Sequence, residues 1–289
     1  MKTRSYLYII AAAALWGLIG LFVKAIAAQG FSSMQIVALR AMASTACITL
    51  VLLYKGVTQL RIDLRDLWMF VGTGIFSLLF FNFCYFNCIQ SSSLAVAALL
   101  LYTAPAFVML MSLLLFGERF TAKKGVALVC TFIGCACVTG ALEGGLNLTL
   151  SGLLYGLGSG FGYALYSIFG KYAVRKYSSL TITAYTFYFA VLAAVPLAGF
   201  DGAALSKINL TTIGGSLGLG LVCAVVPYLL YTKGLKQVEP GQASILATIE
   251  PFVAAAVGML CFAEPLTMSK AMGMLLIFCS IVILNIREK

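Results

Sequence analysis

Apolar residues run through the chain in stretches of about twenty, separated by short clusters of charged residues, and this pattern predicts membrane-spanning helices. At 1.5 Å per residue, about 20 helical residues cross roughly 30 Å of hydrocarbon. The stretches do not alternate apolar with polar residues, as the strands of a membrane barrel would. Ten spans are expected, at about 6–26, 33–54, 67–88, 92–116, 123–140, 151–172, 180–200, 211–233, 241–263 and 268–286.

The second half of the chain repeats scarce residues of the first half. Four of them recur 146 residues later: Pro105, Glu118, Thr121 and Lys124 match Pro251, Glu264, Thr267 and Lys270. Identity elsewhere is sparse, which indicates an old duplication rather than a short-period array. We expect a single transmembrane domain over 1–289, made of a first five-helix repeat over 1–143 and a second over 147–289.

Five spans per repeat is an odd number, so the second repeat enters the membrane in the opposite sense to the first. The predicted fold is therefore all-α, a polytopic membrane protein with ten transmembrane helices arranged as two inverted five-helix repeats. Such inverted repeats are common in secondary transporters, where the substrate site lies near the bilayer midplane between the two halves.

Charge placement predicts the orientation, because Lys and Arg concentrate in short cytoplasmic loops. With both termini cytoplasmic, fifteen basic residues fall on the inner side: Lys2, Arg4, Lys55, Arg61, Arg65, Arg119, Lys123, Lys124, Lys171, Arg175, Lys176, Lys233, Lys236, Arg287 and Lys289. Three fall on the outer side: Lys24, Lys207 and Lys270. The net charge of +10 is then mainly a topology signal and an attraction to the lipid bilayer, and no nucleic-acid partner is expected.

The first run also resembles a secretory signal peptide, because Lys2 and Arg4 precede it and 25–27 reads Ala-Ile-Ala. Against cleavage, the run is long, Lys24 sits beside the supposed site, and the segment has a counterpart around 153–171. We expect it to be retained as the first span.

Residue types that carry catalysis or bind metals are scarce. Histidine is absent, and the nine cysteines all fall within predicted spans, where they resemble small packing residues. No Gly-rich phosphate loop occurs. We expect no catalytic residue, no metal and no cofactor, which disfavours a membrane enzyme or a receptor-like protein.

The repeated motif carries a family resemblance. Tyr102-Thr-Ala-Pro105 leads to Phe116-Gly-Glu118-Arg-Phe-Thr121, and Glu250-Pro251 leads to Phe262-Ala-Glu264-Pro-Leu-Thr267. These elements, with Trp16-Gly17 and Arg40, resemble the EamA-type members of the drug/metabolite transporter superfamily. The resemblance implies a multi-pass carrier of the bacterial cytoplasmic membrane with a central cavity. It also commonly implies export of amino acids or other small metabolites, with substrates that vary widely.

Two charged residues lie inside predicted spans. Glu250 is about 14 Å deep, near the midplane, where a charge faces a cavity, finds a partner or is protonated. Pro251 disfavours helical geometry at Glu250, which favours a loosened helix there. Arg40 lies seven residues inside the second span. It either grips a substrate carboxylate or pairs with Glu250. Neither charge recurs in the other repeat, since Arg40 aligns with Phe187 and Glu250 with Ala104.

Aromatic and polar residues within the spans complete the candidate site. The expected substrate-binding residues are Arg40, Glu250, Trp16, Asn82, Tyr85, Tyr102, Tyr163, Tyr166, Tyr228 and Tyr231. A buried tyrosine hydroxyl needs a partner, and a ring face can hold a cation, although each tyrosine alone also fits simple packing.

Structural roles are expected for several other residues. Pro105 and Pro251 are expected helix breaks or pivots, and Glu118 and Glu264 are expected caps or gate elements at opposite membrane faces. Gly152, Gly156 and Gly160, and Gly214 with Gly218, have the spacing of close helix contacts.

Together these features predict a secondary transporter of a small polar or amphipathic metabolite. An amino-acid-like solute is favoured, with Arg40 and Glu250 meeting its two charges. The alternative is a proton-coupled exporter of organic cations, in which Glu250 alternates between a proton and the drug. Proton coupling and exchange both stay open, as do the oligomeric state and the substrate itself.

Overall fold

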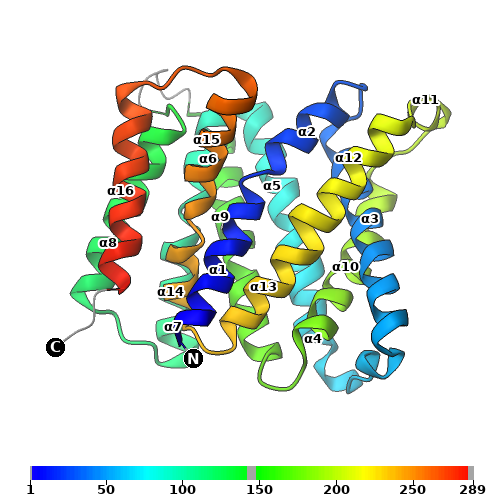
Figure 1. The fold of residues 1–289 in the computed structure, drawn as a ribbon, viewed down its shortest axis with the longest axis horizontal. Helices are drawn as coiled ribbons and strands as arrows, with labels where there is room; N and C mark the ends of the chain where they lie inside the picture. The colour runs from blue at the N-terminus through cyan, green and yellow to red at the C-terminus, as the bar shows by residue number, and fades with distance from the viewer. Residues whose placement is uncertain (1, 142–147, 286–289) are drawn as a thin grey trace.

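The computed structural model describes residues 2–141 and 148–285, and within them the chain is helical with no strand (Figure 1). The expected boundary between the repeats, at 143–147, and the charges Arg287 and Lys289 lie outside the described residues.

Helices cover all ten predicted runs, and several runs are broken into consecutive pieces. The first half contains α1 (Lys2–Trp16), α2 (Ile19–Ala27), α3 (Ser33–Lys55), the 3₁₀ turns η1 (Val57–Leu60) and η2 (Leu64–Asp66), α4 (Leu67–Val71), the π-helical η3 (Gly72–Leu79), α5 (Phe80–Ser91), α6 (Leu94–Leu101), α7 (Ala104–Phe116) and α8 (Ala122–Val138). The second half contains α9 (Leu150–Ala173), α10 (Ser179–Leu197), α11 (Gly202–Ser206), α12 (Leu210–Gly220), the π-helical η4 (Leu221–Val225), α13 (Val226–Leu235), α14 (Pro240–Leu246), α15 (Ile249–Phe262) and α16 (Met268–Asn285).

Seven helical stretches in the described residues are long and apolar enough to cross a membrane: Thr3–Ala27, Ser33–Lys55, Leu64–Ser91, Leu94–Phe116, Ser179–Leu197, Leu210–Leu235 and Pro240–Phe262. The three other predicted runs coincide with α8, α9 and α16. α8 begins with two lysines, and glycines and tyrosines dilute the apolar content of α9. The protein is therefore a multi-span helical membrane protein, and the count of ten stays a prediction.

The helices pack in matched pairs across the two halves. α1 packs on α13, and α9, the first helix of the second half, packs on α5. α3 packs on α10, α7 on α14, and α8 on α16. The start of α1, α4 and α14 lie at the lower edge of Figure 1, and the end of α2, α11 and the end of α15 lie at its upper edge. We call these the N-terminal face and the opposite face.

Glycines set several of these close contacts. A Cβ at Gly156 would clash with Leu100, and one at Gly160 would lie 2.8 Å from the Leu100 carbonyl oxygen, so α9 lies directly against α6. Gly218 likewise lies against the Phe22 ring. The prediction of close contact was wrong for Gly214, where no atom lies within 4 Å of an added Cβ, because this turn of α12 faces away from α2.

Large apolar side chains cover the outside of the bundle, as expected for a surface that faces lipid. Leu114 is 73% exposed and Leu260 is 85% exposed. Aromatic side chains gather at the centre, where Trp16, Tyr166, Phe187, Tyr228 and Tyr231 belong to one buried cluster. The nine cysteines are unpaired.

Candidate functional site

A small cavity lies at the centre of the bundle, among α1, η3, α5, α9 and α13. It is lined by Trp16, Ser77, Leu78, Phe81, Tyr163, Tyr166, Ser167, Tyr228 and Tyr231. The free space that a water-sized sphere can occupy is about 10 Å³, which is room for roughly one water molecule. The surrounding aromatic side chains leave no room in this cavity for a larger molecule.

The indole of Trp16, near the end of α1, organises the aromatic wall. Its ring centroid lies 5.4 Å from Tyr228, 5.4 Å from Tyr231 and 6.2 Å from Tyr163. Trp16 is only 6% exposed, yet its Nε1 has no hydrogen-bond partner among the described residues. A buried donor without an acceptor costs about 1–3 kcal/mol, so the wall presents one unmet donor.

Two hydroxyl pairs hold the tyrosines in place. Tyr166 OH and Thr232 Oγ1 are 2.9 Å apart, and Ser167 Oγ and Tyr231 OH are 2.7 Å apart. Tyr163, Tyr166 and Ser167 occupy one face of α9, because residues three and four apart align on a helix. Sequence reasoning missed Ser77, Leu78, Phe81 and Ser167. The helical spacing from Tyr163 is a signal from which Ser167 follows.

Glu250 joins the cavity through Tyr163, whose hydroxyl donates to Glu250 Oε2 at 3.1 Å. The carboxylate lies in the first turn of α15, where the positive end of the helix dipole favours it. The expected loosening at Glu250 is displaced, because the break between α14 and α15 falls at Ala247 and Thr248 and Glu250 is already helical. Pro251 fits the first turn, where its missing N–H is not needed.

The break between α1 and α2, in the first half of the chain, lies against Glu250. Gly17 lies between α1 and α2, and a Cβ there would be 2.8 Å from the Glu250 carbonyl oxygen. The lack of a side chain at Gly17 therefore brings the α1–α2 break against the start of α15. Pro105 occupies the comparable place in the first half, in the first turn of α7 after the break at Tyr102 and Thr103.

Arg40 makes a contact that the sequence did not predict. Its Nη2 donates to the Cys223 carbonyl oxygen at 3.0 Å, within η4. Pro227, four residues later, has no N–H to give that carbonyl in an α-helical register, and the guanidinium donates to it. Arg40 Nε is buried without a partner, and among the described residues no ion pair within 4.0 Å joins Arg40 to Glu250.

The remaining predicted residues lie around the cavity without lining it. Asn82 Nδ2 donates to the Leu78 carbonyl oxygen of its own helix at 2.6 Å. Tyr85 packs against Phe81, with ring centroids 6.1 Å apart, and Tyr102 packs against the central cluster at the α6–α7 break. Glu118 and Glu264 follow the ends of α7 and α15, and neither lines the cavity.

The arrangement provides aromatic faces and a carboxylate for a cation, with unmet donors at Trp16 and Arg40 for an anion. In the described parts of the chain, no three His, Cys, Asp or Glu side chains are grouped in a way that would hold a metal ion.

The fold and cavity define a multi-span helical membrane protein with a central aromatic site, and comparisons with known proteins give its family. The EamA-like transporter family matches twice, over residues 3–140 and 150–286. The chain belongs to this family.

Similar proteins carry transporter names without a stated substrate. An uncharacterized transporter from Archaeoglobus fulgidus is 34% identical over 244 residues, covering 83% of this chain and 86% of the relative. The uncharacterized inner membrane transporter YicL from Salmonella typhimurium is 23% identical, and the aligned region covers 99% of this chain and 96% of that relative. A crystal structure of a protein that is 19% identical has the same fold, with a TM-score of 0.84 over 99% of this chain and 97% of that chain. These relatives indicate a transporter rather than an enzyme.

Proposed function

We propose that the protein is a secondary carrier that moves a small zwitterionic, amino-acid-like metabolite across the cell membrane, in the direction of export. Ten helices form two inverted five-helix repeats with both termini cytoplasmic, and the central cavity opens alternately to the two sides. The matched helix pairs across the halves and the double family match support this arrangement.

One observation carries the substrate class: the cavity region offers unmet groups of both kinds. Glu250 Oε2 accepts a hydrogen bond from Tyr163, and within the described residues the other carboxylate oxygen accepts none, so it can receive an ammonium group. Trp16 Nε1 and Arg40 Nε are buried donors without acceptors, and a carboxylate satisfies such donors. A zwitterion can pair with both the carboxylate oxygen and the two donors, whereas a neutral apolar solute can pair with neither.

A second candidate is a proton-coupled exporter of organic cations. The observation that favours it is the commitment of Arg40 to the Cys223 carbonyl, which leaves aromatic faces and Glu250 as the main recognition elements. Cations bind well over tyrosine and tryptophan faces beside a carboxylate.

Uptake into proteoliposomes separates the two candidates. Amino acids and quaternary ammonium compounds would be compared as substrates for the wild type, Glu250→Gln and Arg40→Gln. If the protein carries a zwitterion, we expect amino acid flux. Each variant should reduce this flux about tenfold or more, because one charge-assisted contact is lost. Flux of quaternary ammonium alone, unaffected by Arg40→Gln, supports the organic-cation exporter. Absence of flux for both classes, with intact folding, contradicts both candidates.

A further inference from the structure

Two ion-pair clusters occupy equivalent places in the halves. Glu118 follows the left-handed residue that ends α7, and Glu264 follows the left-handed residue that ends α15. Each glutamate faces a lysine six residues later, with Lys124 Nζ at 2.8 Å from Glu118 and Lys270 Nζ at 3.0 Å from Glu264. The Glu118 cluster lies on the N-terminal face and the Glu264 cluster lies on the opposite face.

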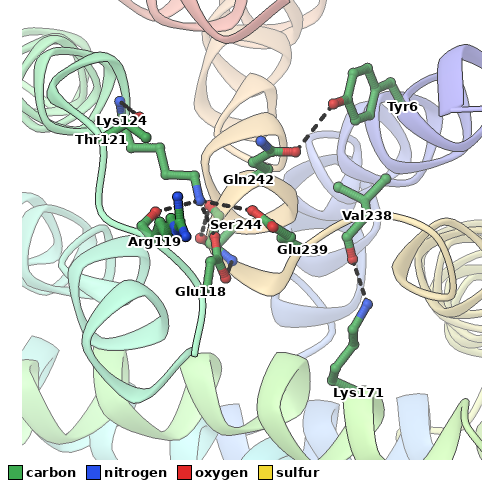
Figure 2. Close-up of polar contacts among 11 residues, drawn as sticks. Tyr6, Glu118, Arg119, Thr121, Lys124, Lys171, Val238, Glu239, Gln242 and Ser244 are labelled. Atoms are coloured by element: carbon green, nitrogen blue, oxygen red, sulfur yellow. Dashed lines mark hydrogen bonds and ion pairs between the residues drawn. The ribbon is translucent and has the colours of Figure 1, made fainter. Parts of the chain in front are cut away.

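The Glu118 cluster ties the two halves together. Figure 2 shows Lys124 reaching between Glu118 and Glu239, with Nζ 2.8 Å from each carboxylate. Glu118 Oε2 also accepts from the backbone N–H of Gly241, in the first turn of α14, at 3.1 Å. The side chains of Glu118 and Lys124 are only 4% and 7% exposed. The end of α7 therefore holds the start of α14 closed over this face.

The Glu264 cluster does not make the matching contact. The offset of 146 residues places Ala95, in the first turn of α6, where Gly241 stands in the other half. Glu264 pairs instead with Lys270 and Lys24, and its side chain is 43% exposed. On the opposite face, the described residues show no such bond from the first turn of α6 to the end of α15.

A second pair of lysines differs in the same way. Lys171, near the end of α9, donates to the carbonyl oxygens of Leu235 and Val238 at 2.9 and 2.8 Å, which fixes the link from α13 to α14. Figure 2 shows its bond to Val238. Lys24, which aligns with Lys171 at an offset of 147 residues, instead lies 3.5 Å from the centre of the Phe262 ring and 3.8 Å from Glu264. Lys24 is thus directed at the end of α15, and not at residues 89 and 92, whose carbonyls are the equivalents of the two that Lys171 binds.

One other contact between the halves has an equivalent on each face. On the N-terminal face Lys176 bonds to Asp66 at 2.9 Å. On the opposite face Asn209 bonds to Gln29 at 2.7 Å, between equivalent loops of the exchanged halves.

We propose that the Glu118 cluster and the Glu264 cluster are alternating closures for the two ends of the transport pathway. This inference rests on the proposed alternating access. In the present state the N-terminal face is closed. In the opposite state Glu264 accepts from the Ala95 N–H and Lys24 donates to the carbonyls of Ile89 and Ser92, while Glu118 releases Gly241 and Lys171 releases the α13–α14 link.

Hydrogen–deuterium exchange of the full chain in lipid nanodiscs tests this, with Glu118→Gln and its counterpart Glu264→Gln as a matched pair. We expect Glu118→Gln to exchange about tenfold faster at residues 239–243, since a charge-assisted bond is lost. It should also exchange more slowly at 93–97, because the opposite face closes. Glu264→Gln should leave 239–243 protected.

Three results would overturn the proposal: no change in Glu118→Gln, faster exchange at 239–243 without protection at 93–97, or the same response from both variants. The exchange readout needs no substrate. If Glu118→Gln shifts protection from one face to the other but no variant transports any solute, the result counts against the proposed function alone. If Glu118→Gln fails to fold, the test instead measures distances between pairs of spin labels in a cysteine-free protein that keeps Glu118. The distance between labels at positions 119 and 237 should be shorter than the distance between labels at the equivalent positions 265 and 91, and equal distances would contradict the closure.

Discussion

The informative residues are those that the duplication does not repeat. Arg40 and Glu250 stand out in the sequence because a charge inside a membrane span is costly and needs a reason. Glu250 lies beside the cavity, where Tyr163 reaches it. Arg40 supplies a hydrogen bond to the Cys223 carbonyl, and the need for it comes from Pro227, a residue 187 positions later in the chain. Sequence spacing does not reveal that pairing.

A double-mutant cycle measures how much of the role of Arg40 is structural. Arg40→Gln should lower the free energy of unfolding by about 1–3 kcal/mol, because the Cys223 carbonyl loses its donor. In a Pro227→Ala background the loss should shrink, since the introduced alanine supplies its own N–H to that carbonyl. Thermal unfolding in detergent gives the stabilities.

If Arg40 also holds the substrate, transport by the Arg40→Gln, Pro227→Ala double variant stays impaired although its stability recovers. Additive losses of stability in the two backgrounds would contradict the proposed capping of Cys223.

At the scale of elements, the breaks occur in equivalent places in the two halves. α6–α7 and α14–α15 are broken just before Pro105 and Pro251, and π-helical segments occupy η3 and η4. The prolines made the breaks predictable to within a few residues. The π-helical turns were not predictable, because no proline or charge marks η3 and its widened turn depends on the neighbouring helices.

The glycines next to η4 provide a test of packing at this scale. A Cβ at Gly220 would lie 2.6 Å from the Ala43 Cβ and 2.8 Å from the Ser44 backbone nitrogen, neither of which can move independently of α3. Gly220→Ala should therefore lower the unfolding free energy by about 1–3 kcal/mol.

Gly214→Ala is the matched control in the same helix, because nothing lies within 4 Å of an added Cβ there. It should be neutral or stabilise by up to about 1 kcal/mol, since alanine favours helix. Equal melting temperatures for the two variants would show that α12 does not pack against α3 as closely as described.

At the scale of the whole molecule, the placement of the basic residues predicts the orientation in the membrane. Gln237 on the N-terminal face and Pro265 on the opposite face are both exposed, and they serve as single-cysteine reporters in a cysteine-free protein. A maleimide that does not cross membranes should label Gln237→Cys only in inverted vesicles and Pro265→Cys only in right-side-out vesicles, because Lys and Arg stay cytoplasmic. The reverse labelling pattern would contradict the orientation, and labelling of both from one side would contradict a membrane crossing by α14 and α15.

The sequence by itself determined that the chain is a helical membrane protein, that it contains a duplication, and that its family is the EamA-like transporters. Hydrophobic length, scarce repeated residues and local motifs can be read along the chain, because recognising them requires no knowledge of which residues are in contact. Only the tertiary structure decided that five of the predicted residues line one cavity, that Arg40 reaches Cys223, and that the Glu118 cluster is closed while the Glu264 cluster is not. Many of these contacts join residues far apart in the chain, such as Ser167 and Tyr231, 64 positions apart, and Arg40 and Cys223, 183 positions apart, and such contacts depend on how the helices pack.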